Sequence, residues 1–308
     1  MLHGIAGNCY PYGAPCLGST GGTGILIECV LRIRGVVVSV PCLQADLALR
    51  YELLGRLRVT RGGVDLTPEQ PKLTKLLALL LIRAGKTVPG EKLVTELWEQ
   101  GPPRCAFASL RVYVSQLRKI LNGPTGTSPI ATTSPGYILD VSGATTDFQE
   151  FEVLYTRGRE RYGAADFLHA SELLRRASSL WRGPILEGIQ GSLDIESFAA
   201  VHEEKRLNCI ELSIDSTLAL GCHHEVIEDL KGLLVRHPLR EPFYRQLMVA
   251  LYRAGRQGDA LGTYRSARRM IREELGVEPG PTLRLAHEAI LRADPARLEA
   301  AGVIPAIR

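Results

Sequence analysis

The sequence lacks the residue patterns that most enzymes and membrane proteins require. Its seven histidines form no His-x-x-x-His or Glu-x-x-His cluster and its seven cysteines include no Cys-x-x-Cys pair, so we predict no metal site and no catalytic residues. The glycine-rich stretch 18–24 lacks the Gly-Lys-Ser/Thr ending of a phosphate-binding loop, and we expect no cofactor. The apolar stretch 25–40 is interrupted by Glu28, Arg32 and Arg34, which predicts no membrane span. A secretory signal pattern is also missing, which favours a cytoplasmic protein.

Positive charge is concentrated in one part of the chain. The formal net charge of the whole sequence is +4. Residues 50–140 contain 13 Lys and Arg against 7 Asp and Glu, whereas residues 141–308 contain 22 against 24 and residues 1–49 contain 2 of each. Because phosphate contacts dominate DNA affinity, this distribution favours DNA binding by the first region and protein contacts by the second.

A helix without acidic residues is predicted over residues 104–121. Its large apolar side chains recur three and four residues apart and define one face: Phe107, Leu110, Val114, Leu117 and Leu121. The remaining faces carry basic and polar side chains: Arg104, Arg111, Ser115, Gln116, Arg118 and Lys119. A solvated surface helix is the alternative, but such helices usually mix charges of both signs. The pattern therefore favours a helix that enters the major groove of DNA.

The neighbouring segments place this helix in a winged helix-turn-helix. Residues 71–84 predict an apolar helix that stops at Gly85, and residues 91–99 predict a second, shorter helix. Residues 51–59 and 63–66 predict short antiparallel strands around a turn at 61–63. A hairpin ending at Tyr137 follows the basic helix and predicts the wing.

Four motifs follow the basic region: WRGP at 181–184, HPLRE at 237–241, LYRAGRQ at 251–257 and EELGVEP at 273–279. With the order of strands, three helices and hairpin, they resemble the Streptomyces antibiotic regulatory protein family. In that family an OmpR-type winged helix precedes a bacterial transcriptional activation domain. The resemblance covers about residues 50–293. It implies a mainly α-helical protein, with an α+β winged helix followed by an all-α tetratricopeptide-like domain.

The resemblance divides the chain into two domains and two flanking segments. The winged helix is expected at 50–141 and the activation domain at 147–293, joined by a short linker and followed by a C-terminal tail at 294–308. Residues 1–49 show no helical or strand period. We expect them to be disordered or an artefact of the assigned start site, and their four cysteines give little support to a metal or disulfide.

An internal repeat supports the helical domain. The segment from Leu218 to Gly221 recurs 34 residues later as Tyr252 to Gly255, and similar residues follow each copy. A 34-residue period is typical of tetratricopeptide repeats, which present a curved surface to partners. We expect Gly255 where paired helices approach closely.

The resemblance also implies DNA-binding positions. Alignment of Leu117-Arg118-Lys119 with the winged-helix class places four side chains toward DNA: Arg111, Ser115, Gln116 and Arg118. We also expect Arg104, Tyr113 and Lys119 to bind DNA. The wing, residues 132–137, would press on phosphate or the minor groove through Tyr137 and Thr133. Thr133 departs from relatives, where this position is often basic. Packing inside the protein against Trp98 or Phe107 is the alternative for Tyr137.

These observations predict a DNA-binding activator of a secondary-metabolite gene cluster rather than an enzyme. The resemblance implies binding to direct repeats in double-stranded promoter DNA, recruitment of RNA polymerase holoenzyme, self-association on tandem repeats and a place at the nucleoid. No receiver domain precedes the winged helix, so an ordinary two-component response regulator is not expected. A helical-repeat scaffold and a repressor with the same DNA fold remain as alternatives.

Overall fold

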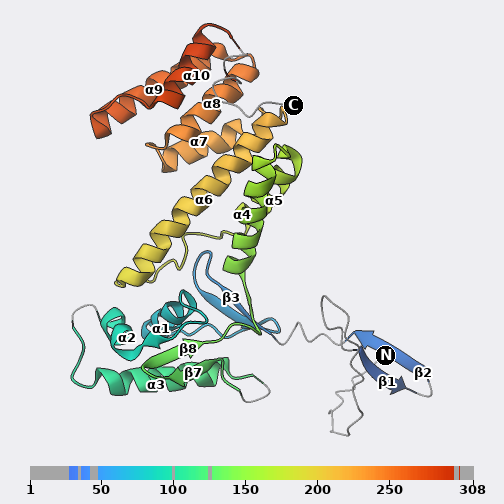
Figure 1. Cartoon of the computed structure of the whole chain (residues 1–308), viewed down its shortest axis with the longest axis vertical. Coiled ribbons are helices and arrows are strands. Elements are labelled where there is room, and N and C mark those ends of the chain that lie inside the picture. The colour runs from blue at the N-terminus through green and yellow to red at the C-terminus, as the bar shows by residue number, and fades with distance from the viewer. Residues whose placement is uncertain are drawn as a thin grey trace, which may run out of the picture.

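The computed structural model describes residues 28–33, 36–41, 48–98, 101–123, 127–294 and 298. The described chain forms a winged helix and a larger helical region (Figure 1). Strands β1 (Glu28–Ile33) and β2 (Val36–Pro41) form a separate antiparallel hairpin. The sequence showed no strand period there, because four of the six residues of β2 are consecutive or near-consecutive valines instead of an alternating pattern. The rest of the expectation for residues 1–49 falls outside the described residues, except for 48–49.

The winged helix is built from two small sheets and three helices (Figure 1). The first sheet consists of β3 (Leu49–Glu52), β4 (Arg58–Arg61), β5 (Val64–Asp65) and β9 (Thr145–Thr146) in the order β5-β4-β3-β9. Strand β4 is antiparallel to both β3 and β5. Helices α1 (Pro71–Leu81), α2 (Gly90–Leu97) and α3 (Ala106–Leu121) follow. The second sheet has the order β6-β8-β7, from β6 (Val88–Pro89), β7 (Ile130–Thr133) and β8 (Gly136–Leu139).

Several predicted elements differ from the structure in their bounds. Helix α1 ends at Leu81 instead of 84, and α2 spans Gly90–Leu97 instead of 91–99. The strand expected over 51–59 is two strands, β3 and β4, separated by a loop at 53–57. The loop forms because Leu53, Leu54 and Leu57 are buried at the junction with the helical region instead of alternating between two faces. The basic helix begins at Ala106 instead of 104, with Cys105 at its N-cap.

Seven helices follow in the described part of the chain. They are α4 (Asp147–Gly163), α5 (Phe167–Ser179), α6 (Leu193–Ala219), α7 (Ile227–Arg236), α8 (Glu241–Arg253), α9 (Gln257–Leu275) and α10 (Pro281–Leu291). Helices α4 and α5 and the first part of α6 share one apolar core with the winged helix. The end of α6 and helices α7 to α10 form a second core.

The repeat glycines end helical segments and do not sit at tight helix crossings. Gly221 and Gly255 have φ angles of 81° and 73°, a left-handed conformation that glycine adopts without steric cost. Nothing lies within 4 Å of a Cβ built at Gly255, so the expected close approach of helices there is wrong. The close approach occurs at Gly158 of α4, where a Cβ would lie 2.6 Å from Leu174 Cγ of α5.

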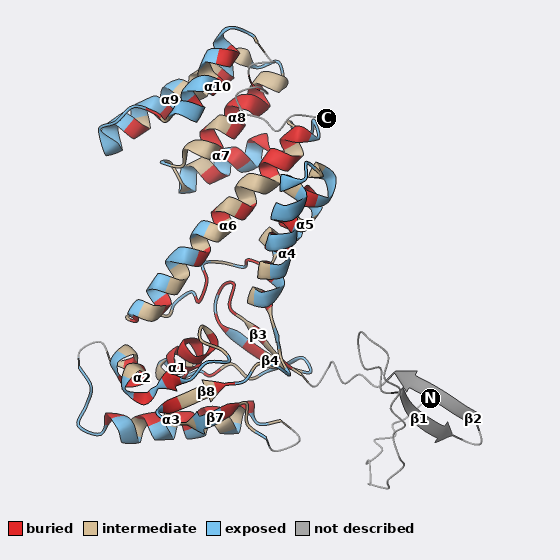
Figure 2. Ribbon diagram, viewed as in Figure 1, coloured by how far each residue is buried: buried red, intermediate tan, exposed pale blue. Residues whose placement is uncertain are grey.

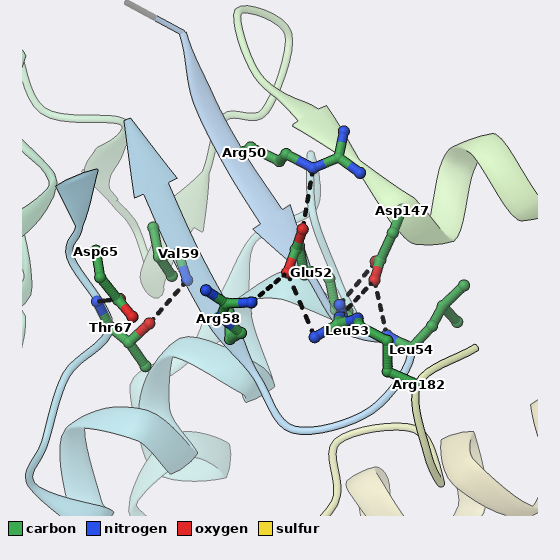
Figure 3. A network of polar contacts seen from close by, with 10 residues as sticks. All are labelled: Arg50, Glu52, Leu53, Leu54, Arg58, Val59, Asp65, Thr67, Asp147 and Arg182. Atoms are coloured by element: carbon green, nitrogen blue, oxygen red, sulfur yellow. Dashed lines mark hydrogen bonds and ion pairs between the residues drawn. The ribbon is translucent and has the colours of Figure 1, made fainter. Parts of the chain in front are cut away.

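The last two residues of the expected linker are part of the first sheet. Strand β9 (Thr145–Thr146) pairs in parallel with β3, and Thr146 caps α4 through its side chain. Asp147, at the start of α4, accepts hydrogen bonds from the backbone N–H groups of Leu53 and Leu54 at 2.7 and 3.0 Å (Figure 3). The winged helix and α4 are therefore joined without a free hinge.

Candidate nucleic-acid interface

Helix α3 lies at the edge of the winged helix with one side on the core and one side exposed (Figure 2). The buried positions are spaced four, four, three and four residues apart: Ala106, Leu110, Val114, Leu117 and Leu121. Phe107 was expected in this set but is 50% exposed. The small Ala106 takes the inward position at the start of the helix, and Phe107, one residue on, is rotated about 100° away from it.

The opposite side of the helix forms a polar surface, which we call the α3 face: Arg111, Val112, Ser115 and Lys119, all exposed. Arg104, also exposed, lies in the turn before the helix. A guanidinium, an amine and a hydroxyl group thus point away from the core along one side of α3. Such groups can donate hydrogen bonds to phosphates and to guanine edges, and Val112 offers an apolar contact.

Two predicted residues lie at the border between the α3 face and the core. Tyr113 is half-buried and stacks on Trp98, with 6.2 Å between ring centroids and 25° between planes. Gln116 is also half-buried, and its Oε1 has no hydrogen-bond partner among the described residues. Neither side chain is as free to approach DNA as those of the α3 face.

Arg118 joins α3 to the wing. Its Nε donates to the carbonyl oxygen of Ile130 at 3.0 Å, and its Nη2 donates to Thr132 Oγ1 at 2.7 Å. The guanidinium therefore has partners inside the protein. This position holds β7 against α3, which a purely sequence-based alignment does not reveal.

Arg61 was not predicted to have a role, and it caps the C-terminal end of α3. Its guanidinium donates to the carbonyl oxygens of Leu121 at 2.7 Å and Asn122 at 2.6 Å. A basic group at a helix C-terminus satisfies free carbonyl groups and the helix dipole. No local pattern signals this role, because Arg61 and Leu121 are 60 residues apart.

The wing is a tight hairpin of β7 and β8 turning at Ser134 and Pro135. Thr133 is half-exposed, with its Oγ1 3.2 Å from Thr87 Oγ1. Tyr137 pairs with Val88 and Thr132 across the sheet and is partly buried against the core. A Cβ at Gly136 would lie 1.9 Å from the Val88 carbonyl oxygen, so only glycine lets β8 lie this close to β6.

The described residues were also compared with the requirements of a metal site and of a membrane-spanning helix. Among them, no three His, Cys, Asp or Glu side chains are grouped to hold a metal ion. In the same residues, no helix is long and apolar enough to cross a membrane. The exposed basic and polar side chains make the α3 face, with the adjacent wing, the candidate site that the described structure favours.

Two family models match the chain. "Bacterial transcriptional activator domain" matches residues 146–291, and "Transcriptional regulatory protein, C terminal" matches residues 63–139. These matches fall on the helical region and on the winged helix.

Curated relatives span both regions. The regulatory protein AfsR of Streptomyces coelicolor is 38% identical over 82% of this chain, which spans 25% of AfsR. The regulatory protein DnrI of Streptomyces peucetius is 35% identical over 80% of this chain and 93% of DnrI. The transcriptional regulatory protein EmbR of Mycobacterium tuberculosis is 37% identical over 83% of this chain and 68% of EmbR.

A solved structure has the same fold. It is that of Mycobacterium tuberculosis EmbR in complex with a low-affinity phosphopeptide. It matches with a TM-score of 0.76 and 36% identity, over 82% of this chain and 69% of that chain. The arrangement of winged helix and helical region is therefore shared with this regulator.

Proposed function

Because the chain belongs to the Streptomyces antibiotic regulatory protein family, we propose that it is a sequence-specific DNA-binding activator of transcription. In this proposal it acts on the promoters of a secondary-metabolite gene cluster. The α3 face enters the major groove and the wing contacts the adjacent backbone. The helical region contacts RNA polymerase holoenzyme, and copies of the protein associate on tandem repeats. The protein works in the cytoplasm, at the nucleoid, and has no catalytic role.

The observation that carries the proposal is the exposed, acid-free side of α3. The exposed side of α3 carries Arg111, Ser115 and Lys119, each four residues from the next, and no residue of α3 has a carboxylate. Helix-turn-helix proteins read base edges from such a helix, while phosphate contacts hold it in register. The named relatives AfsR and DnrI, both regulatory proteins, support the regulatory role.

The predicted DNA-binding residues fall into two groups by their exposure and hydrogen bonding. Arg104, Arg111, Ser115 and Lys119 are exposed and suited to direct DNA contact. Tyr113, Gln116, Arg118, Thr133 and Tyr137 are partly buried or hydrogen-bonded within the winged helix. We propose that this second group supports the shape of the interface more than it reads bases.

The proposal is tested by selection of bound duplexes from a random-sequence library, followed by transcription in vitro. The selected duplex is placed upstream of a weak core promoter, and transcripts are made with purified bacterial RNA polymerase holoenzyme. An activator raises the transcript yield several-fold. Binding without a change in yield would favour the scaffold, and a reduced yield would favour a repressor.

A further inference from the structure

Helix α6 connects the winged helix to the far end of the molecule. Its 27 residues give it a length of about 40 Å. Ile195, in its first turn, belongs to the core shared with the winged helix, whereas Ile214 and Leu218, near its end, belong to the second core. Figure 1 shows α6 running from beside α1 to α7. A tilt of about 10° at its start would move its far end by about 7 Å, given that length.

One carboxylate at the start of α6 is held by two segments of the winged helix. Asp194 Oδ2 accepts hydrogen bonds from Arg83 Nε at 2.9 Å and Arg83 Nη2 at 2.7 Å. The same oxygen lies 2.8 Å from Lys92 Nζ of α2. Arg83 is the second residue after α1 and Lys92 is in α2, so Asp194 connects α6 to α2 and to the segment that follows α1, and both of these helices pack against α3.

A second hydrogen bond, between Ser192 and Glu96, also joins the start of α6 to α2. Ser192 Oγ, at the N-cap of α6, donates to Glu96 Oε2 of α2 at 2.6 Å. The Asp194 side chain is only 18% exposed. Partial burial by itself would raise the pKa of Asp194, but the hydrogen bonds from Lys92 and Arg83 outweigh it and leave the pKa below its usual value. Asp194 is therefore ionised whenever the protein works near neutral pH.

The protein surface is hollowed beside this ion pair. A hollow of about 360 Å³ opens next to Asp194, lined by Ile82, Arg83, Ala84, Lys86, Ser197 and Phe198. The first turn of α6 is attached beside this hollow through the polar contacts of Ser192 and Asp194 and through the buried side chain of Ile195. The opposite end of the interface is fixed differently, by β9 and by Asp147. The contacts of Asp194 thus act together with those of Ser192 and with the hydrogen bond from Lys75 to the Gly191 carbonyl to set the angle of α6.

We propose that Asp194 is a positioning residue for activation: by binding Arg83 and Lys92 it fixes the angle of α6 against the winged helix, and so places helices α7 to α10 relative to bound DNA. This inference rests on the proposed function. It assigns to a residue far from the α3 face a part in activation that is separate from DNA affinity.

The angle is measured directly by double electron–electron resonance in the full chain. Nitroxides are attached to p-acetylphenylalanine introduced at Glu69 and Arg269, exposed positions on the winged helix and on α9. The wild type should give one narrow distance distribution. Asp194→Asn should broaden it or shift its maximum, and Lys92→Gln should have a smaller effect. Circular dichroism confirms that each variant is folded.

Glu196→Gln is the matched control. Glu196 is in the same first turn of α6 and carries the same charge, but it is exposed and has no ion pair among the described contacts. Its substitution removes the same interaction with the helix dipole without touching Arg83 or Lys92. The distribution should match the wild type. A distribution for Asp194→Asn that equals those of the wild type and Glu196→Gln would overturn the proposal.

Transcription in vitro then tests the consequence for activation. The selected duplex is moved in steps of about half a DNA turn relative to the promoter. Wild type and Glu196→Gln should activate strongly only when the duplex lies on one face of the DNA relative to the promoter. In Asp194→Asn the ratio of transcript yields between the favourable and the unfavourable spacing should fall by at least about threefold. Its Kd for the duplex should stay within about twofold of the wild-type value. An unchanged spacing profile would overturn the proposal even if the distances changed. Wild type that binds no duplex would instead contradict the proposed function, and the resonance distances would still report on the angle.

Discussion

Arg118 of α3 donates a 2.7 Å hydrogen bond to Thr132 Oγ1 of the wing. The second bond from the same guanidinium, to the Ile130 carbonyl, fixes its orientation. In the sequence, Arg118 and Arg111 look alike, since both are arginines on a basic helix. In the structure, Arg111 is exposed on the α3 face and Arg118 is half-buried beside β7.

This difference predicts different effects of substitution. Arg111→Ala should remove a side chain that can contact a guanine edge and reduce discrimination between selected and scrambled duplexes by about 1–3 kcal/mol. Arg118→Ala should loosen the wing and weaken binding to both duplexes by a similar factor. Fluorescence anisotropy with each duplex measures both quantities. Loss of discrimination in Arg118→Ala alone would reverse the assignment of the two arginines.

The contacts of Asp147 predict that the winged helix depends on the chain that follows it. Asp147→Ala leaves the buried N–H groups of Leu53 and Leu54 without their acceptor and Arg182 without its 2.9 Å partner (Figure 3). Each unsatisfied buried group costs about 1–3 kcal/mol, so the loss of an acceptor for two groups should lower the free energy of unfolding by about 2–6 kcal/mol. Urea denaturation measures the loss. Asp140→Ala, at an exposed position, is the control, and an equal loss in both variants would argue against this role.

The glycines of α4 predict opposite effects within one helix. In Gly158→Ala the new Cβ would lie 2.6 Å from Leu174 Cγ and force α4 from α5, which should cost about 1–3 kcal/mol. Gly163→Ala, with nothing within 4 Å, should be neutral or stabilise by up to about 1 kcal/mol. Thermal denaturation of the two variants separates the cases. If Gly163→Ala were the more destabilising, the packing of α4 on α5 would be misassigned.

The lowered pKa of Asp194 predicts how its contribution depends on pH. A carboxyl group with a depressed pKa in the folded state stabilises the protein above its unfolded-state pKa of about 3.9, and this stability is lost as pH falls through the folded-state pKa. Wild type and Asp194→Asn should therefore differ in free energy of unfolding by about 1.5–3 kcal/mol near pH 7, the range for hydrogen bonds to charged groups. The difference should shrink below about pH 4. Urea denaturation at a series of pH values measures it, and a difference that grows in acid would be contrary to the ion pairs described.

Local patterns predicted most elements of the winged helix. The spacing of Leu110, Val114, Leu117 and Leu121 identified the buried side of α3, because helical periodicity is a property of neighbouring residues. The same reasoning placed Phe107 inside, and this was wrong at the helix end, where a small residue one position earlier packs inward. The order of elements and the later motifs led to the family, which the comparisons confirmed.

Contacts between distant segments could not be predicted in this way. Arg61 caps α3 across 60 residues, and Asp147 binds the 53–54 amides across more than 90. No spacing rule connects such pairs, since they depend on how the elements pack. The sequence pattern placed the repeat glycine Gly255 between two helices, but the reason for glycine there is its left-handed backbone angle. The tight helix crossing is at Gly158 instead.

Sequence-specific DNA binding is the central claim, and the affinity ratio of the full chain for two duplexes tests it most directly. Anisotropy at about 150 mM salt compares the selected duplex with one of equal composition in scrambled order. Specific binding is typically about 1,000-fold or more tighter than non-specific binding, and we predict a ratio of at least that order. Equal affinity for the two duplexes, within about threefold, would contradict the assignment of the α3 face as a reader of DNA sequence.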